Sequence, residues 1–410
     1  MRGNLTLVLF RTMSIALAVV INVFLIKFLS PIEVGKYYII GSIAYFGNAL
    51  FFVGFDFSLQ RKIKNISIEK SIDFSSLQSY IFKTLPYGVL ASFVLSSIVF
   101  FADNLHNWFG TALLCAALSA INFLVTVLRN ILLISGEKNR FSYSLLLEQL
   151  AKFCFCCTII LFFDASAIVF TIAFMLAGLV CFIFNYQQIT RCLYPVNSTA
   201  SYDVDSNDIS KIFLPVSAGG VLNWLQLQAY RPVLGQFFQK AELVGTVSFL
   251  TMLGATATSA SLGVLAQIWT PKQFATNGDA SRRFVQLACV IIFSLALLAY
   301  PVAYIFLRLL KIDNLYGLEY LVSFGVIMEG CNFILGVLGN HTSLTVKSFL
   351  PSMFAGVVGL VAVVFIIFIV DTYQWMGPGT IGFALAVSQC VAVAALLPVL
   401  FRKLSMSTSP

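Results

Sequence analysis

The sequence predicts an all-α polytopic membrane protein with about twelve transmembrane helices in two six-helix bundles related by a parallel repeat. Hydrophobic residues make up 59% of the 410 residues and charged residues only 10%, whereas soluble domains have roughly 45–50% and about 25%. Apolar runs of about twenty residues, long enough to cross ~30 Å of hydrocarbon, recur from end to end. An internal repeat at half the length of the chain supplies the third observation.

The repeat is visible in two unconnected segments. The stretch 25–38 (LIKFLSPIEVGKYY) returns in altered form at 234–247 (LGQFFQKAELVGTV), which matches Glu33 to Glu242 and Gly35 to Gly245. The segment 122–130 (NFLVTVLRN) returns as 332–340 (NFILGVLGN), with five of nine positions identical and an offset of 210. A common offset of about 210 indicates a duplicated chain. We therefore predict an N-terminal bundle at 1–190, a cytoplasmic linker at 191–209 and a C-terminal bundle at 210–410, both bundles in the same orientation.

The apolar runs predict twelve helical spans, because backbone amides in lipid must be paired within the segment. Between the first two spans, Pro31 and Gly35 together with nearby charges are typical of a tight aqueous turn. Pro215, Gly219–Gly220 and Pro232 predict an interrupted seventh span. The predicted spans are 5–29, 36–57, 79–101, 109–134, 143–163, 165–188, 212–238, 242–269, 284–309, 317–345, 348–370 and 378–401.

The distribution of Lys and Arg predicts the orientation. With the N-terminus inside, 18 of the 25 Lys and Arg residues lie on the cytoplasmic side, where Arg11 and Arg129 are counted by their nearer face; 5 lie outside, and Lys152 and Arg231 remain within spans. The positive-inside rule therefore places both termini in the cytoplasm. The net charge of +8 mostly reflects this bias, and it gives no reason to expect nucleic-acid binding.

Several kinds of chemistry have no support in the sequence. The nine cysteines lie almost entirely inside spans, where small apolar packing is their ordinary role. Only two histidines are present, so a Cys/His metal site is not expected. The phosphate-cradling G-x-x-x-x-G-K-[ST] loop of an ATP-driven pump is missing. We predict no metal and no cofactor.

Charged side chains inside the spans are the candidates for function, because each is costly there unless it faces a cavity or a partner. Guanidinium and ammonium groups would hold the phosphate oxygens of an anionic headgroup, and buried carboxyl groups would carry a coupling ion. The predicted substrate-binding residues are Arg11, Arg129, Lys152 and Arg231, and the predicted ion-coupling residues are Glu148, Glu329 and Asp56.

Most of these residues also have a purely structural interpretation. Glu148 and Lys152 are one turn apart on one helical face, in the favourable order, so they can neutralise each other. The three arginines can extend to the nearest membrane interface. Asp56 is most simply a boundary residue, bonded to backbone amides or to Arg61. Glu329 has no partner nearby in the sequence, which makes it the hardest to explain structurally.

Three segments carry a resemblance to a known family. The segment 28–37 (FLSPIEVGKY) resembles the Leu-Gly-Pro-Glu-Glu-Phe-Gly-x-Tyr segment of bacterial polysaccharide flippases, the O-antigen and capsule translocases of the multidrug/oligosaccharidyl-lipid/polysaccharide exporter superfamily. The segment 55–59 (FDFSL) resembles that family's Asp-Leu-Gly-Leu, and 230–238 (YRPVLGQFF) resembles its Asp-Arg-x-x-Leu-Gly-x-Phe-Leu. The chain departs from the pattern at Ser58, where Gly is common, and at Tyr230, where Asp is common. The second departure removes an expected ion partner of Arg231.

The resemblance implies a bacterial inner-membrane flippase, which is not an enzyme. It would move undecaprenyl-diphosphate-linked oligosaccharide repeat units from the cytoplasmic to the periplasmic leaflet by alternating access, coupled to an ion gradient. Its partners would be the lipid-linked substrate, membrane lipids, and assembly proteins such as the polymerase and the chain-length regulator, without nucleic acid.

Two other functions stay open. A drug/cation antiporter of the same superfamily predicts an acidic cavity, whereas the residues embedded in the spans include four cations and two carboxylates. A membrane polysaccharide polymerase would be expected to carry a large periplasmic loop with acid/base groups, whereas the longest predicted outside loops have about ten residues. A structural scaffold would not need buried charges.

Overall fold

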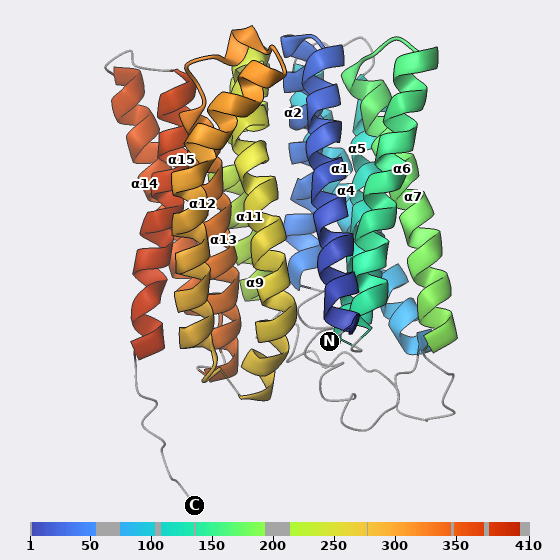
Figure 1. The fold of residues 1–410 in the computed structure, drawn as a ribbon, viewed down its shortest axis with the longest axis vertical. Coiled ribbons are helices and arrows are strands. Elements are labelled where there is room, and N and C mark those ends of the chain that lie inside the picture. The colour runs from blue at the N-terminus through green and yellow to red at the C-terminus, as the bar shows by residue number, and fades with distance from the viewer. Residues whose placement is uncertain are drawn as a thin grey trace, which may run out of the picture. The chain divides into compact units, whose positions relative to one another are not determined.

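The computed structural model describes residues 2–54, 74–102, 108–134, 137–192, 214–276, 278–345, 348–372 and 377–401, and all regular structure in these ranges is helical (Figure 1). Ten of the described helices are long and apolar enough to cross a membrane. Two interrupted helical stretches, described below, make up the remaining spans. The prediction of an all-α polytopic membrane protein with about twelve helices is confirmed.

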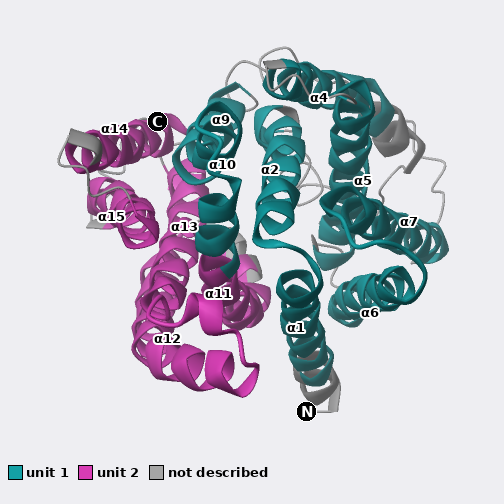
Figure 2. Cartoon of the chain, turned by 90° about the horizontal axis from the view of Figure 1, so that it is seen from above, with its two compact units in different colours: residues 1–249 teal, residues 250–410 magenta. Residues whose placement is uncertain are grey.

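The helices group into two compact units, Met1–Phe249 and Leu250–Pro410 (Figure 2). Unit 1 contains α1 (Arg2–Phe28), α2 (Pro31–Gly47), η1 (Asn48–Phe52), α4 (Phe74–Ala102), α5 (Trp108–Ile134), α6 (Lys138–Phe162), α7 (Ala167–Cys192), α9 (Leu214–Leu227), α10 (Tyr230–Pro232), η3 (Val233–Phe237) and the first turns of α11 (Ala241–Ala275). Unit 2 contains the rest of α11, α12 (Ser281–Leu309), η4 (Asp313–Leu315), α13 (Tyr320–Thr345), α14 (Leu350–Thr372), α15 (Pro378–Leu396) and η5 (Leu397–Phe401).

The division between the units falls inside α11, so α9, α10 and η3 group with the helices that precede them. Residues 193–209 of the predicted linker lie outside the described residues. The predicted bundle boundaries at 190 and 210 stay a prediction.

The predicted turn between the first two spans leads directly into α2, whose N-terminus has common capping residues. Ser30 caps α2, and its hydroxyl accepts a hydrogen bond from the Glu33 amide at 3.3 Å. Pro31 occupies the first helical position, where its missing N–H costs nothing. The Glu33 carboxylate then accepts the Ala167 amide at the start of α7 at 2.9 Å. This turn therefore also fixes the first turn of α7.

Two predicted spans are not continuous α-helices. The span predicted at 36–57 begins as α2 and continues as the π-helical η1. The span predicted at 212–238 consists of α9, a turn at 228–229, α10 and the π-helical η3. The interruption was predicted, but its position was partly wrong: Pro215 and Gly219–Gly220 lie within α9, whereas Pro232 does lie at the break. Pro215 is accepted in α9 because it falls in the first turn.

Gly220 serves close helix packing rather than interruption. A Cβ built on Gly220 would overlap the backbone carbonyl of Ala49 in η1. Because glycine has no side chain, it lets the backbones of η1 and α9 approach each other. The Phe52 ring of η1 stacks on Phe123 of α5, with ring centroids 3.7 Å apart. These two contacts pack η1 against both α9 and α5.

Helix α1 lies along α6 in unit 1 (Figure 2). Phe10 contacts the ring of Tyr143 at 5.9 Å, Ser14 donates to the Leu145 carbonyl at 3.3 Å, and the Phe24 ring stacks on Phe153 at 5.7 Å. The residue numbers rise together along both helices, so α1 and α6 run parallel. This agrees with their positions as the first and fifth predicted spans, which must cross the membrane in the same direction. The α6 face described below is therefore fixed against α1.

The two copies of the repeated stretch 25–38 meet in unit 1. Gly35 and Gly245, which the offset of 210 matches to each other, lie where α2 passes the start of α11. A Cβ on Gly35 would overlap the Ala241 carbonyl, and a Cβ on Gly245 would lie 2.8 Å from the Pro31 carbonyl oxygen. The repeated glycine is thus required in both copies for one backbone contact.

Unit 2 has a similar contact of its own between α11 and α13. A Cβ on Gly254 would overlap the Val322 carbonyl, and a Cβ on Gly325 would overlap the Thr251 carbonyl. Further along the same two helices, the Gln273 amide donates to the Val337 carbonyl at 2.8 Å. Small residues and one amide therefore hold α11 against α13.

Candidate functional site

The embedded charges of unit 1 gather on one face of α6. Phe141, Ser144, Glu148 and Lys152 follow one another at spacings of three, four and four residues, which places them on a single helical face. From Phe141 to Lys152 this face extends about 16 Å along the helix at 1.5 Å per residue. We call its charged residues, together with Arg11 and Arg129, the cationic cluster.

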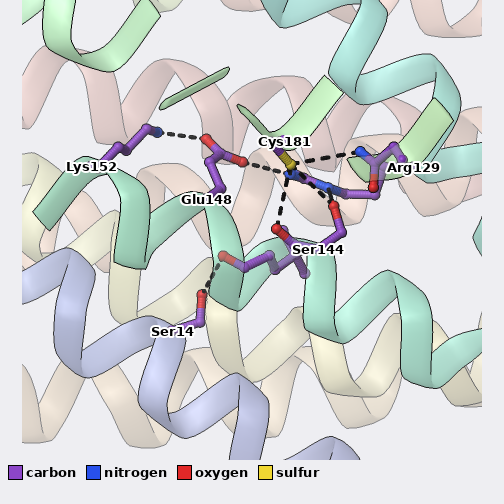
Figure 3. Close-up of polar contacts among 8 residues, drawn as sticks. Ser14, Arg129, Ser144, Glu148, Lys152 and Cys181 are labelled. Atoms are coloured by element: carbon purple, nitrogen blue, oxygen red, sulfur yellow. Dashed lines mark hydrogen bonds and ion pairs between the residues drawn. The ribbon is translucent and has the colours of Figure 1, made fainter. Parts of the chain in front are cut away.

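Glu148 lies at the centre of the cluster and bridges two cations (Figure 3). One carboxylate oxygen is 2.6 Å from Nη2 of Arg129 on α5, and the other is 2.6 Å from Nζ of Lys152 one turn further along α6. The exposed fractions of the three side chains are 13% for Arg129, 16% for Glu148 and 21% for Lys152. Charges with so little solvent contact require partners, and one carboxylate serves both cations.

Neutral side chains complete the surroundings of Arg129. Its Nε donates to the Ser144 hydroxyl at 3.2 Å, and its Nη2 also approaches Sγ of Cys181 on α7 at 3.2 Å. Cys181 is fully buried and also contacts the Ser144 hydroxyl at 3.2 Å and the Asn185 amide at 3.6 Å. The guanidinium is thereby held between α5, α6 and α7 in one orientation.

Arg11 joins the cluster at the first turn of α6. Its guanidinium carbon lies 5.2 Å from the centroid of the Phe141 ring, within the range of a cation–π contact. With Arg11 included, the cluster has three cations and one carboxylate, a formal charge of +2. An excess of positive charge among membrane helices attracts anions.

A series of aromatic contacts leads from the cluster to Arg231. Lys152 Nζ lies 5.3 Å from the Phe174 ring, and the Phe174 ring lies 5.6 Å from the ring of Tyr37. Tyr37 contacts Tyr38 at 5.3 Å, and the Arg231 guanidinium carbon is 5.4 Å from the Tyr38 ring. Arg231 thus belongs to the same unit as the cluster but lies beyond three aromatic rings.

Glu329 is not part of this arrangement, because it lies on α13 in unit 2. Its carboxylate accepts a hydrogen bond from the hydroxyl of Ser259 on α11, and the Asn332 side chain also donates to it. No ion pair involves Glu329 among the residues that the structure describes. Glu148 and Glu329, predicted to share one role, therefore have different surroundings.

The structure brings together Arg11, Arg129, Glu148 and Lys152 of the predicted site, places Arg231 elsewhere in unit 1, and assigns Glu329 to unit 2. Asp56 lies outside the described residues. Sequence reasoning treated the cysteines as packing residues and missed Cys181, Ser144 and Asn185 as polar neighbours of Arg129. The spacing of Ser144, Glu148 and Lys152 by four residues would have found the serine, whereas nothing local indicates that α7 contacts this face.

A cleft of about 500 Å³ opens elsewhere in unit 1. Its lining includes the ion pair between Glu33 and Lys36, the start of α7, and Gln236 and Gln239 beyond the interrupted span. None of the predicted site residues lines this cleft.

Comparison with known proteins gives the fold. No protein-family model matches the sequence, and no curated protein matches it. Among solved structures, an outward-facing MATE family multidrug resistance transporter of the MOP superfamily aligns with a TM-score of 0.63 and 14% identity, covering 97% of this chain and 94% of the other. The chain has the fold of these transporters. This is a fold of twelve helices in two bundles.

Two further solved structures agree. An inward-facing MATE family transporter of the MOP superfamily aligns with a TM-score of 0.59 and 15% identity over 95% of this chain and 96% of the other. The lipid II flippase MurJ, in an inward closed conformation, aligns with a TM-score of 0.60 and 16% identity over 96% of this chain and 87% of the other. Multidrug transporters and a lipid flippase thus share the fold, so the fold alone leaves the substrate open.

Proposed function

We propose that this protein is a membrane flippase for an anionic lipid-linked oligosaccharide, and more closely for undecaprenyl-diphosphate-linked repeat units of a surface polysaccharide such as O-antigen. The observation that carries the proposal is the cationic cluster, in which Arg129 and Lys152 share the single carboxylate of Glu148 and Arg11 adds a further positive charge beside Phe141. Arginine holds phosphate oxygens in a two-pronged arrangement, and lysine adds a point charge. A diphosphate would supply the negative charge that the cluster lacks.

The extent of the cluster supports a path for the headgroup. In the predicted orientation, Arg11 and Phe141 lie towards the cytoplasmic side, and Lys152 lies near the middle of its span. A diphosphate would meet Arg11 first and then pass along about 16 Å of the α6 face. The polyprenyl tail would stay in lipid, and alternating access would release the headgroup at the periplasmic leaflet.

We propose Glu329 as the group that binds the coupling ion. Its hydrogen-bond donors are the neutral side chains of Ser259 and Asn332, so binding a proton would not break an ion pair. Glu148 was predicted for the same role, but binding a proton there would leave Arg129 and Lys152 without their shared counterion. The predictions for Glu148 and Asp56 remain untested.

The proposal includes a location and partners. The protein would lie in the bacterial inner membrane with both termini in the cytoplasm, as the positive-inside rule predicts. Its product would be a repeat unit in the periplasmic leaflet, so a polymerase and a chain-length regulator would act after it.

A drug/cation antiporter is the second candidate, because multidrug transporters are among the proteins that share this fold. The comparisons support both candidates equally. The sign of the cluster distinguishes them, because an organic cation would be repelled by a site with a formal charge of +2. Under this alternative Glu148 and Glu329 would be the substrate-binding groups.

The experiment that tests the proposal is deletion of the gene, followed by mass spectrometry of lipid-linked sugars with the leaflet recorded. The flippase proposal predicts complete repeat units that accumulate on the cytoplasmic face, with export restored by the wild-type chain. Single units that reach the periplasm without polymer would indicate a polymerase. Unchanged lipid-linked sugars with intact surface polysaccharide would overturn the proposal and leave the antiporter as the better account.

A further inference from the structure

The surroundings of Arg231 differ from those of Arg129, which pairs with the carboxylate of Glu148. Only 7% of Arg231 is exposed. Its Nε donates to the Tyr230 hydroxyl at 3.3 Å, and an Nη1 hydrogen is donated to the side-chain oxygen of Gln228. The rings of Tyr38 and Tyr230 lie 5.4 and 5.6 Å from its guanidinium carbon. All of these neighbours are neutral.

The positive charge of Arg231 therefore has no counterion among the residues that the structure describes, where the ion pairs are those of Lys36, Arg129, Arg140 and Lys152. A guanidinium has five N–H donors and no acceptor, and a buried charge without a partner is strongly disfavoured. Aromatic faces offset only part of that cost.

The Tyr38 hydroxyl adds a second unmet requirement beside the first. Tyr38 is 4% exposed, and its hydroxyl is buried without a hydrogen-bond partner among the described residues. A buried hydroxyl in this state is rare, because losing water without replacing its hydrogen bond is costly. The positive charge of Arg231 on α10 and the hydroxyl of Tyr38 on α2, unbonded among the described residues, therefore occur together where these two helices meet.

The backbone around this position is fixed. At the turn at 228–229, the Gln228 carbonyl accepts both the Arg231 amide at 3.1 Å and the Ser42 hydroxyl of α2 at 2.9 Å. The Trp224 indole donates to the Ser42 carbonyl at 2.8 Å, and its ring contacts Phe46 at 4.9 Å. The Tyr230 hydroxyl is in turn bonded to Ser248 at 2.9 Å. These hydrogen bonds and the ring contact let an interrupted helix hold a charged side chain in place.

We propose that Arg231 and the Tyr38 hydroxyl form a binding site for a small monovalent anion of the size of chloride, separate from the cationic cluster. One such anion would supply the missing counterion and accept a hydrogen bond from the Tyr38 hydroxyl and from the guanidinium. The proposal does not depend on the substrate proposed above. It differs from the sequence prediction, in which Arg231 binds the same substrate as Arg11, Arg129 and Lys152.

The test compares purified protein in chloride and in gluconate at equal ionic strength, with the thermal unfolding midpoint as the readout. Binding to the folded state alone raises the midpoint with chloride concentration. We expect this rise in the wild type and its loss in Arg231→Gln. Arg129→Gln is the matched control, because it removes a buried arginine of the cluster, and it should keep the chloride response.

If Arg231→Gln does not fold, Tyr38→Phe provides a second test of the site. Removing a buried hydroxyl that has no partner among the described residues should leave the midpoint in gluconate unchanged or raised. It should weaken the chloride dependence about tenfold in concentration, the effect of losing one hydrogen bond to a charged group. A Tyr38→Phe variant that responds to chloride like the wild type would contradict the role of the hydroxyl.

Two results would overturn the site. One is a wild-type midpoint that is the same in chloride and gluconate. The other is a chloride response that persists in Arg231→Gln but disappears when Arg129, Glu148 and Lys152 are replaced together by Gln, since chloride would then bind the cluster. A short-chain prenyl diphosphate that abolishes the wild-type chloride response by competition would assign Arg231 to the substrate site, against the proposal. Failure of diphosphate binding alone would leave the chloride response intact.

Discussion

The two copies of the repeat differ in the charged residues that their corresponding helices carry. In the first copy, α5 and α6 bring Arg129, Glu148 and Lys152 together. In the second copy the offset of 210 matches Arg129 to Gly339, and α14 has no charged residue from Leu350 to Val370. At these matched positions, the charged face is present in the first copy and missing from the second. Any anionic substrate should therefore be held mainly by unit 1.

The two embedded carboxylates, Glu148 and Glu329, also differ in the charge of their partners. Glu148 is tied to two cations, so changing its charge disturbs the cluster. Glu329 is held by neutral donors, so its charge can change with less effect on its neighbours. Under the proposed function, Glu148 in unit 1 keeps its charge and Glu329 in unit 2 changes its charge when the coupling ion binds.

The largest expected effect comes from removing the shared counterion. Glu148→Gln leaves Arg129 and Lys152 without their carboxylate partner at low exposure, and we expect a loss of about 3 kcal/mol in the free energy of unfolding. Glu329→Gln is the matched control in unit 2, where a hydroxyl can still bond an amide, and it should cost roughly 1 kcal/mol or less. Denaturant unfolding in detergent measures both. Equal losses would contradict the difference between the carboxylates.

A smaller effect is expected where the two copies touch. Gly35→Ala should cost about 2 kcal/mol, because the new methyl overlaps the Ala241 carbonyl and forces α2 away from α11. Gly41 lies six residues along the same helix, and a methyl group there would have no described atom within 4 Å, so Gly41→Ala should be neutral or stabilise by up to about 1 kcal/mol. Gly245→Ala should fall between them, since its nearest atom is 2.8 Å away. Thermal unfolding of the three variants measures the order. If Gly35→Ala were as stable as Gly41→Ala, the backbone contact would be wrong.

The smallest effect concerns the matched acids at the starts of α2 and α11. Glu33 accepts the Ala167 amide at 2.9 Å and pairs with Lys36 at 2.7 Å, so Glu33→Gln should cost about 1 kcal/mol, as for the loss of a helix cap. Glu242, its counterpart, is exposed, and Glu242→Gln should change the stability by less than about 0.5 kcal/mol. Thermal unfolding of the two variants side by side checks this order, and the reverse order would refute it.

Much of the fold follows from local sequence properties. Apolar length predicts helices because lipid leaves the backbone no other partner, and the pairing of Glu148 with Lys152 follows from their spacing on one helix. The start of α2 follows from Ser30 and Pro31 through capping chemistry. Each of these features depends on residues within a few positions of one another.

Features that depend on distant residues were not predicted. Arg129 meets Glu148 and Cys181 because α5, α6 and α7 pack together, and no spacing in the sequence encodes that contact. The π-helical ends of two spans and the isolation of Arg231 from the cluster likewise result from packing. The sequence did indicate, through Tyr230, that Arg231 would lack an acidic partner beside it.

The most direct test of the central claim is the binding of a short-chain prenyl diphosphate to purified protein, measured by isothermal titration calorimetry. Three proteins are needed: the wild type, Glu148→Gln, and a variant in which Arg11, Arg129, Glu148 and Lys152 are all Gln. The account predicts that the fully neutral variant loses at least about a hundredfold in affinity, the effect of two charge-assisted hydrogen bonds. It predicts that Glu148→Gln binds as tightly as the wild type or more tightly, because the cluster gains net positive charge. Wild-type affinity in the neutral variant would contradict the account, as would a Glu148→Gln protein that loses the diphosphate.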